Sequence, residues 1–193
     1  MTDKTAVYTA VNTVKEDTME KHLLKNGKEL TIRLAKAEEA QEFLNYVNQC
    51  GKETDFLSFG KEGIGLNVEE EKKYFESFTD KNFMLVALVD NKIVGSCSLR
   101  TNESRMRLKH IGVLGITILK DYWGIGIGKS LILSAIEKGK KSGLTRIELL
   151  TRVDNEKAIS LYKKLGFEIE GQLKNAVYID GKYFDNYIMG LII

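Results

Sequence analysis

The chain has 193 residues, the size of one ordinary domain or of a domain with an extension. Hydrophobic residues make up 43% and charged residues 29%, which is globular composition and excludes wholesale disorder. With 29 basic and 27 acidic side chains the net charge is +2, which does not favour a protein that binds nucleic acid or a membrane surface. Two cysteines cannot form a disulfide framework, and two histidines offer little material for a metal site.

Residues 1–18 mix polar and apolar side chains without a clear period, and we interpret them as an N-terminal extension. They contain no apolar core of signal-peptide length, and the longest apolar stretch, Ile111 to Leu119, is too short to cross a membrane. These features predict a cytoplasmic protein. No linker or low-complexity tract interrupts the rest of the chain, so we expect residues 19–193 to form a single domain.

The first elements expected along the chain are a hairpin and two helices. Asn26-Gly27 separates two strand-like runs and predicts a two-residue turn, in which both positions have positive φ. Apolar residues at helical spacing predict a helix from Ala37 to Cys50, with Gly51 as its C-cap. A second helix is expected to start near Glu69. We interpret its acidic run, Glu69–Glu71, as compensation of the helix dipole.

The middle of the chain is expected to consist mostly of strands. Phe83–Val89 and Ile93–Arg100 flank a tight turn, and Leu108–Leu119 is a third long β-like run. A glycine-rich turn then leads into a helix within Gly124–Lys141, which has one apolar face.

The last third is expected to add a strand, a short helix and a hairpin. Arg146–Thr151 has the pattern of a buried strand, and Asp154 can cap a helix that ends at Leu165. Phe167–Ile179 and Lys182–Ile192 are two final strands joined by an Asp-Gly turn. One strand–helix–strand crossover among mostly antiparallel strands predicts a three-layer α/β (α+β) domain.

The segment Trp123–Ser130, with the sequence WGIGIGKS, lies between an expected strand and an expected helix. Backbone N–H groups and the helix dipole form an anion site at such a place, and glycines let a phosphate approach the backbone. A Walker A loop would need glycine at Trp123. A dinucleotide-binding G-x-G-x-x-G would need glycine at Lys129 or Leu131. Neither pattern matches, so a nucleotide-hydrolysing P-loop is not favoured.

The remaining pattern resembles the pyrophosphate loop of the GNAT superfamily of acyl-CoA-dependent N-acetyltransferases. The family consensus Q/R-x-x-G-x-G/A aligns with Trp123 to Gly128, and Trp123 replaces the usual Gln or Arg. A second segment, Asp154 to Phe167, resembles the N-x-x-A-x-x-x-Y-x-x-x-G-F pattern of the same superfamily. Its Asn155 and Tyr162 are seven residues apart and therefore share one helix face. The C-terminal hairpin is similar to the branch that includes ribosomal-protein and polyamine acetyltransferases.

The resemblance implies a mixed, mostly antiparallel sheet with helices on both faces and splayed fourth and fifth strands, here Leu108–Leu119 and Arg146–Thr151. Acetyl-CoA would lie between those two strands, with its pyrophosphate on the glycine loop and its pantetheine arm near Asn155. No metal is implied. The implied cofactor-binding set is Ile116, Thr117, Ile118, Trp123, Gly124, Ile125, Gly126, Ile127, Gly128, Lys129, Ser130, Asn155, Ala158 and Tyr162.

The resemblance also implies direct attack of a primary amine on acetyl-CoA through a tetrahedral intermediate. The amine would belong to a small molecule or to a peptide N-terminus. Tyr162 would protonate the leaving thiolate, because the ordinary pKa values of a phenol and a thiol are close enough for the transfer.

The base that takes the amine proton is open. Many relatives carry a glutamate just before the Gly-Ile pair, where this chain has Val113 and Leu114. Glu53 is our candidate base, and Asp55 or His110, the latter acting through water, are the alternatives.

Other functions stay open beside this one. The chain could transfer another acyl group, or it could be a non-catalytic CoA-binding sensor or scaffold of the same fold. An intact Tyr162 argues against a mere binder, which needs no leaving-group acid. We expect neither nucleic acid nor membrane as a partner, and a homodimer formed through the last strands is plausible.

Overall fold

The computed structural model describes residues 19–193, so the extension expected for residues 1–18 lies outside the described residues. The strands are β1 (Glu20–Leu23), β2 (Glu29–Leu34), β3 (Phe83–Val89), β4 (Lys92–Arg100), β5 (Ile111–Ile118), β6 (Arg146–Arg152), β7 (Glu168–Ile179) and β8 (Lys182–Ile192). The helices are α1 (Ala40–Glu53), α2 (Val68–Glu76), α3 (Ile127–Lys141) and α4 (Glu156–Lys164), with the short 3-10 helices η1 (Ala37–Glu39) and η2 (Lys120–Tyr122).

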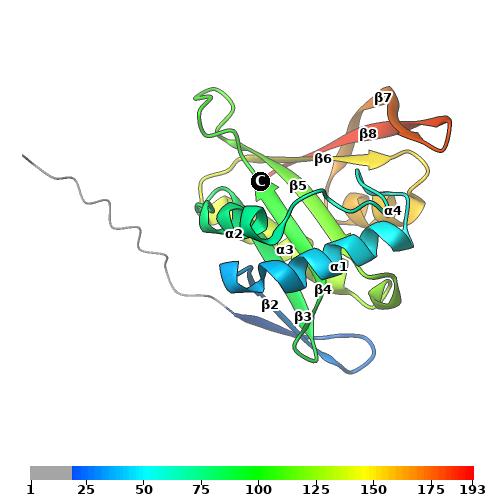
Figure 1. Cartoon of the computed structure of the whole chain (residues 1–193). Helices are drawn as coiled ribbons and strands as arrows, with labels where there is room; N and C mark the ends of the chain where they lie inside the picture. Colours follow the sequence, from blue (N-terminus) through cyan, green and yellow to red (C-terminus); the bar gives the residue numbers. More distant parts are fainter. Residues whose placement is uncertain (1–18) are drawn as a thin grey trace, which may run out of the picture.

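All eight strands belong to one sheet, in the order β1-β2-β3-β4-β5-β6-β8-β7 (Figure 1). Each neighbouring pair is antiparallel except β5 and β6, which are parallel and are joined through α3. The expected mixed, mostly antiparallel sheet with one crossover is therefore confirmed.

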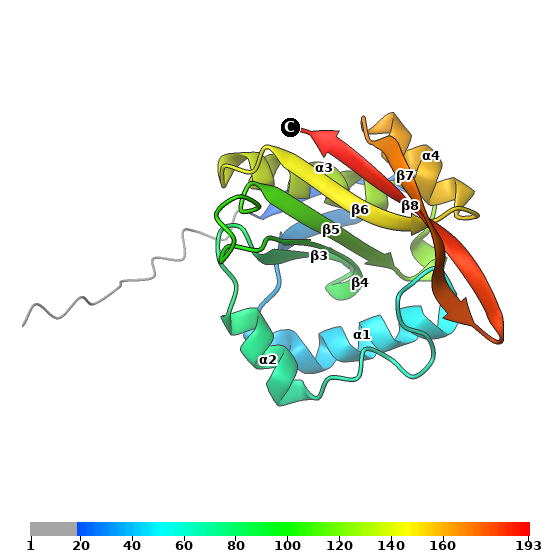
Figure 2. The same cartoon turned by 90° about the horizontal axis from the view of Figure 1, so that it is seen from above.

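Helices cover both faces of the sheet, as expected (Figure 2). On one face α1 and α2 pack together, with the rings of Phe43 and Phe75 edge to face at 5.2 Å between centroids. On the other face lie α3 and α4, and Leu131 and Ile132 of α3 are fully buried in the core. Strand β4 alternates between the two layers, because Cys97 belongs to the α3-side core whereas the hydroxyl of its neighbour Ser96 accepts from Tyr46 of α1.

Two turns differ from each other although both were expected to be two-residue turns. Asp180 and Gly181, between β7 and β8, both have positive φ, as that turn type requires. At the first hairpin only Gly27 has positive φ, and the Leu24 amide donates to the Lys28 carbonyl at 2.9 Å. The β1–β2 connection is therefore a longer loop with one left-handed glycine.

The expected C-cap at Gly51 is wrong, since α1 continues through it to Glu53. Gly51 is buried, and a Cβ there would lie 2.3 Å from the Gly60 carbonyl oxygen. The glycine therefore serves close packing of the following loop against α1 and does not end the helix.

Two further boundaries differ for local reasons. Strand β5 starts at Ile111, because the Leu108 and Lys109 amides donate to the Arg105 carbonyl in a preceding turn. The N-cap of α4 is Asn155 and not Asp154.

Replacing Gly51 with alanine is expected to destabilise the fold by about 1–3 kcal/mol, the usual cost of overpacking. The added Cβ would meet backbone at 2.3 Å, and backbone cannot shift as cheaply as a side chain. Urea unfolding measures the change. Gly139→Ala is the comparison, because its nearest neighbours are side-chain methyls, those of Leu99 at 3.0 Å, Leu144 at 3.4 Å and Ile147 at 3.8 Å, and alanine favours the helix. Equal stability of both variants would contradict the argument.

Candidate active site

Strands β5 and β6 pair over three residues only. Residues Ile111–Val113 pair with Arg146–Glu148, and beyond them β5 runs on to Ile118 and β6 to Arg152 without pairing between the two. Parallel strands that stop pairing midway diverge at their carboxyl ends. The structure thus contains the expected splay between these strands.

The free edge of β5 faces this opening. The Leu119 amide donates to the Val94 carbonyl of β4 at 3.0 Å, so strand alternation turns the backbone groups of Ile118 and Ile116 toward the opposite edge. A hydrogen bond from the Trp123 indole Nε1 to the Ile118 carbonyl, at 2.7 Å, is consistent with this orientation of the Ile118 backbone. The Ile116 amide and carbonyl can therefore pair with an extended ligand as an added strand would.

The glycine loop forms an open cradle at the N-terminus of α3. Gly124 and Gly126 have φ values of 78° and 112°, and a Cβ at either position would have no atom within 4 Å. Gly128 differs from them, since a Cβ added there would lie 3.3 Å from methyl groups of both Ile118 and Leu161. It lets the start of α3 approach β5 and α4 closely.

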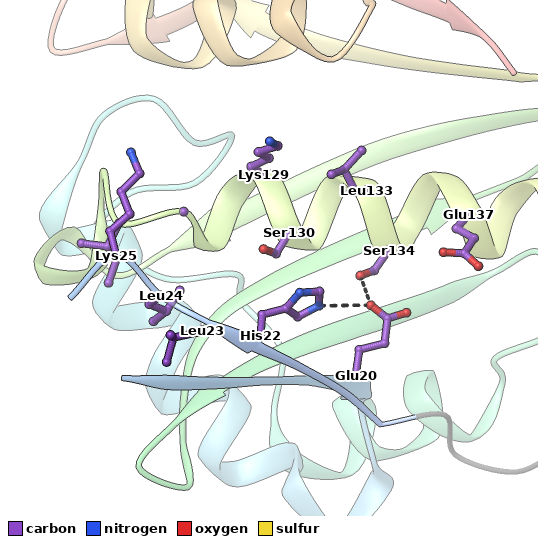
Figure 3. A pocket seen from close by; sticks show the side chains of 12 residues that line it. Glu20, His22, Leu23, Leu24, Lys25, Lys129, Ser130, Leu133, Ser134 and Glu137 are labelled. Atoms are coloured by element: carbon purple, nitrogen blue, oxygen red, sulfur yellow. Dashed lines mark hydrogen bonds and ion pairs between the residues drawn. The ribbon is translucent and has the colours of Figure 1, made fainter. Parts of the chain in front are cut away.

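The other side chains at the start of α3 point in different directions. Ile127 is fully buried in the core and can offer a ligand only its backbone, whereas Lys129 is exposed. Figure 3 shows Ser130 on the side of α3 that faces β1. There a cavity of about 380 Å³ lies between α3 and β1, and the Ser134 hydroxyl donates to Glu20 at 2.5 Å. The cavity is also lined by Ile125 and Gly126, so it adjoins the glycine loop.

Helix α4 carries the second part of the expected site. Asn155 makes no side-chain capping bond, so its amide is left for a ligand, and Ala158 packs against the core. The buried Tyr162 ring meets Phe167 edge to face at 5.9 Å between centroids. Its hydroxyl has no hydrogen-bond partner within residues 19–193. Burial, and then the nearby Cys97, raise the pKa of Tyr162, so the phenol stays protonated at neutral pH.

Thr117, expected to bind the cofactor, turns its side chain toward α1 instead. The Tyr46 hydroxyl donates to the Thr117 carbonyl at 2.8 Å and lies 2.5 Å from Thr117 Oγ1. The Ser96 hydroxyl lies 2.9 Å from the same Oγ1. Burial raises the pKa of Tyr46 well above its usual value. This buried hydroxyl cluster ties α1 to the end of β5, and its members are too far apart in the chain for sequence patterns to reveal it.

Glu53, the expected base, fastens two segments together. Its carboxylate accepts hydrogen bonds from Gln49 Nε2 at 2.9 Å and from the Lys120 backbone amide at 2.7 Å. Glu53 thus joins the end of α1 to the turn that follows β5.

The two alternative bases lie at different places. His110 immediately precedes β5, and at about 3.3 Å per residue it lies roughly 25 Å from the other end of that strand. It is therefore distant from the glycine loop. Asp55 is near the opening, in the loop after α1, and its carbonyl accepts from Arg152 Nη1 at 3.1 Å.

Arg152, at the end of β6, is a site element that sequence analysis missed. It is buried, and its guanidinium lies 4.9 Å from the Phe56 ring centroid and 3.8 Å from that of Phe184. It also pairs with Asp154, which lowers the pKa of that carboxyl and explains why Asp154 does not cap α4. Arg152 thus holds the loop after α1 against the β8 strand beside the opening.

Residues 54–167, more than half of the chain, match the model of the acetyltransferase (GNAT) family. The chain belongs to the GNAT family. It is 30% identical over 173 residues to an N-alpha-acetyltransferase of Sulfurisphaera tokodaii, covering 86% of this chain and 94% of that protein. It is 36% identical over 109 residues to the L-amino acid N-acetyltransferase AaaT of Escherichia coli, covering 56% of this chain and 67% of that protein.

Solved structures of GNAT proteins share the fold. An acetyltransferase of the GNAT family from Streptococcus pneumoniae superposes with a TM-score of 0.82 at 38% identity, over 85% of this chain and 99% of that one. The ribosomal-protein-alanine N-acetyltransferase of Brucella melitensis reaches 0.75 at 23% identity, over 84% and 99% of the two chains. At 23% identity, the similarity to the Brucella melitensis protein shows a shared fold only.

Family membership and these relatives make the chain an acetyl-CoA-dependent N-acetyltransferase that acts on an amine. The residues fit the co-substrate, because the cradle at Gly124 and Gly126 is open and the edge of β5 is unpaired. Of the helices described in residues 19–193, each is too short or too polar to traverse a bilayer.

Proposed function

We propose that acetyl-CoA binds in the opening between β5 and β6 and that its acetyl group passes to a primary amine of a small molecule or of a peptide N-terminus. The observation that carries this proposal is the end of β5–β6 pairing after Val113, beside the N-terminus of α3. A strand edge and a helix N-terminus meet there, which suits a ligand with both amides and phosphates.

Each part of the site has a role in this proposal. The thioester supplies an activated acyl group. The Ile116 and Ile118 backbone pairs with the pantetheine amides, the amides of the glycine loop hold the pyrophosphate, and Asn155 contacts the pantetheine arm. The buried Tyr162 phenol, which keeps its proton at neutral pH, protonates the leaving thiolate.

The role of Glu53 as general base stays a prediction. Both oxygens of the carboxylate already accept a hydrogen bond from the chain, Oε1 from Gln49 and Oε2 from the Lys120 amide. That geometry favours a positioning role, in which Glu53 fixes the turn between β5 and the glycine loop.

The acceptor class comes from the relatives. AaaT acts on L-amino acids, the archaeal relative on protein N-termini, and a spermidine N(1)-acetyltransferase of Escherichia coli is 36% identical over 69 residues. We propose these three amine classes as the acceptors to test first. A cytoplasmic location, a homodimer, and the absence of metal, nucleic-acid and membrane partners stay predictions.

Thermal melting with acetyl-CoA, CoA and ATP side by side tests the cofactor. A ligand at 100 times its Kd adds about 2.7 kcal/mol of stability, which is a shift of several degrees for a chain of this size. We expect shifts with acetyl-CoA and CoA and none with ATP. Acetylation is then measured with leucine, spermidine and a short peptide. No shift with acetyl-CoA would contradict the proposal.

A further inference from the structure

Side chains hold two successive peptide groups at the end of β5. The Tyr46 hydroxyl of α1 donates to the Thr117 carbonyl at 2.8 Å, which fixes the peptide group between Thr117 and Ile118. Trp123 Nε1 donates to the Ile118 carbonyl at 2.7 Å, which fixes the next one. Pairing between β5 and β6 stops at Val113, well before these residues. Side chains therefore give this part of the strand an order that the missing pairing with β6 does not supply.

The hydrogen bond from Tyr46 sets the direction of a neighbouring N–H group. In a planar trans peptide the C=O and the N–H point in opposite directions. The Thr117 carbonyl is turned toward α1 and β4, since it accepts from Tyr46 and Thr117 lies opposite Ser96 of β4. The Ile118 N–H belongs to the same peptide group. It therefore points the other way, into the opening between β5 and β6.

The position of the Tyr46 hydroxyl is well defined. The residue is 5% exposed, and its ring packs on Phe43 at 5.6 Å between centroids. Burial raises the pKa of Tyr46 well above its usual value, so the phenol keeps its proton and remains a donor. The Thr117 carbonyl, at 2.8 Å, is a closer acceptor for that proton than Ser96 Oγ at 3.3 Å. The Thr117 hydroxyl, at 2.5 Å, can itself donate to the Tyr46 oxygen.

We propose that Tyr46 is a positioning residue, which holds the Thr117–Ile118 peptide group so that the Ile118 N–H meets a carbonyl of the pantetheine arm. This role rests on the proposed function and deepens it, because Tyr46 lies on α1, outside the opening, and prepares the strand edge for acetyl-CoA. A donor that is already oriented costs less ordering when the ligand binds. A carbonyl that accepts a hydrogen bond is also polarised, which strengthens the N–H of the same peptide group as a donor.

Tyr46→Phe tests the proposal, with Ser96→Ala as the matched control. Phenylalanine removes the hydroxyl that binds the Thr117 carbonyl and keeps the ring in the core. Ser96→Ala removes another buried hydroxyl of the same cluster but leaves the bond from Tyr46 to the Thr117 carbonyl in place. Calorimetric titration with CoA gives the Kd of each protein, and urea unfolding gives its stability.

We expect both variants to lose stability and only Tyr46→Phe to lose affinity. Its Kd for CoA should rise about fivefold, which is about 1 kcal/mol of binding free energy and the net value of one hydrogen bond. The Kd of Ser96→Ala should stay that of the wild type. CoA is the probe because it carries the pantetheine arm without the acetyl group, so binding is measured without turnover.

The Ile118 amide proton reports the contact itself. Saturating CoA should move its NMR signal downfield in the wild-type protein, because an N–H that donates to a carbonyl is deshielded. At saturation the movement should be smaller in Tyr46→Phe and unchanged in Ser96→Ala. A residue that only stabilises the fold would leave the movement in the saturated protein as it is.

The outcomes separate the role of Tyr46 from the function of the site. Wild-type affinity for CoA in Tyr46→Phe, or an equal loss in Ser96→Ala, would overturn the positioning role. An Ile118 amide that does not move when CoA binds the wild-type protein would overturn it as well, and this measurement decides even if Tyr46→Phe fails to fold. If the wild-type protein bound no CoA at all, the proposed function would be overturned instead.

Discussion

Replacing Tyr162 with phenylalanine is expected to lower kcat by a factor of about 10²–10⁴, the usual contribution of a general acid. The hydroxyl has no hydrogen-bond partner within residues 19–193, so its removal should cost neither folding stability nor acetyl-CoA binding. Burial raises the pKa of the phenol, and the protonated form that an acid needs is therefore present at neutral pH. Steady-state acetylation of an accepted amine measures the loss, and melting with acetyl-CoA measures binding.

Tyr46→Phe is the matched control, because Tyr46 is also a buried tyrosine whose pKa is raised. The Tyr46 hydroxyl, in contrast, has hydrogen-bond partners. Phenylalanine would leave the Thr117 carbonyl and hydroxyl without those bonds, which should cost about 1–3 kcal/mol of stability. A normal kcat in Tyr162→Phe, or a fall in its Tm comparable to that of Tyr46→Phe, would show that the Tyr162 hydroxyl is structural.

Those parts of the fold that depend on local chemistry could be predicted from the sequence. The Asp180-Gly181 turn is an example, because the two residue types favour the positive φ that they adopt. Gly51 shows the limit. A glycine after a helical stretch is typical of a C-cap, but here the requirement comes from the Gly60 carbonyl, nine residues away in the chain and adjacent in space.

The same distinction applies to the site. The glycine loop and the Asn155–Tyr162 spacing can be recognised in the sequence, because each lies within one continuous segment. The Tyr46 cluster joins three separate elements and leaves no local pattern. Glu69, Glu70 and Glu71 look alike in the sequence, yet Glu70 completes the cap with Asn67 while Glu71 turns inward. The rotation of α2 about its own axis determines which of these side chains is buried. Tertiary packing sets that rotation, and no local sequence pattern reveals it.

Replacing Gly126 with alanine is expected to raise the Kd for acetyl-CoA at least tenfold, more than 1.4 kcal/mol of binding free energy. Gly126 is the N-cap of α3 with φ at 112°, and no atom lies within 4 Å of its Cβ position. The methyl group would therefore find room in the protein alone, but it would stand in the cradle where we place the pyrophosphate. Titration with acetyl-CoA measures the Kd.

Alanine at positive φ also strains the backbone by about 1–2 kcal/mol, and this cost must be separated from the effect on binding. Gly27→Ala provides the control, because Gly27 has φ at 80° and likewise no atom within 4 Å of a Cβ, but it lies in the β1–β2 loop. Both variants should lose similar stability, while Gly126→Ala alone loses affinity. If both bound acetyl-CoA like the wild type, the loop would be a mere connection between β5 and α3, and the phosphate site would have to lie elsewhere.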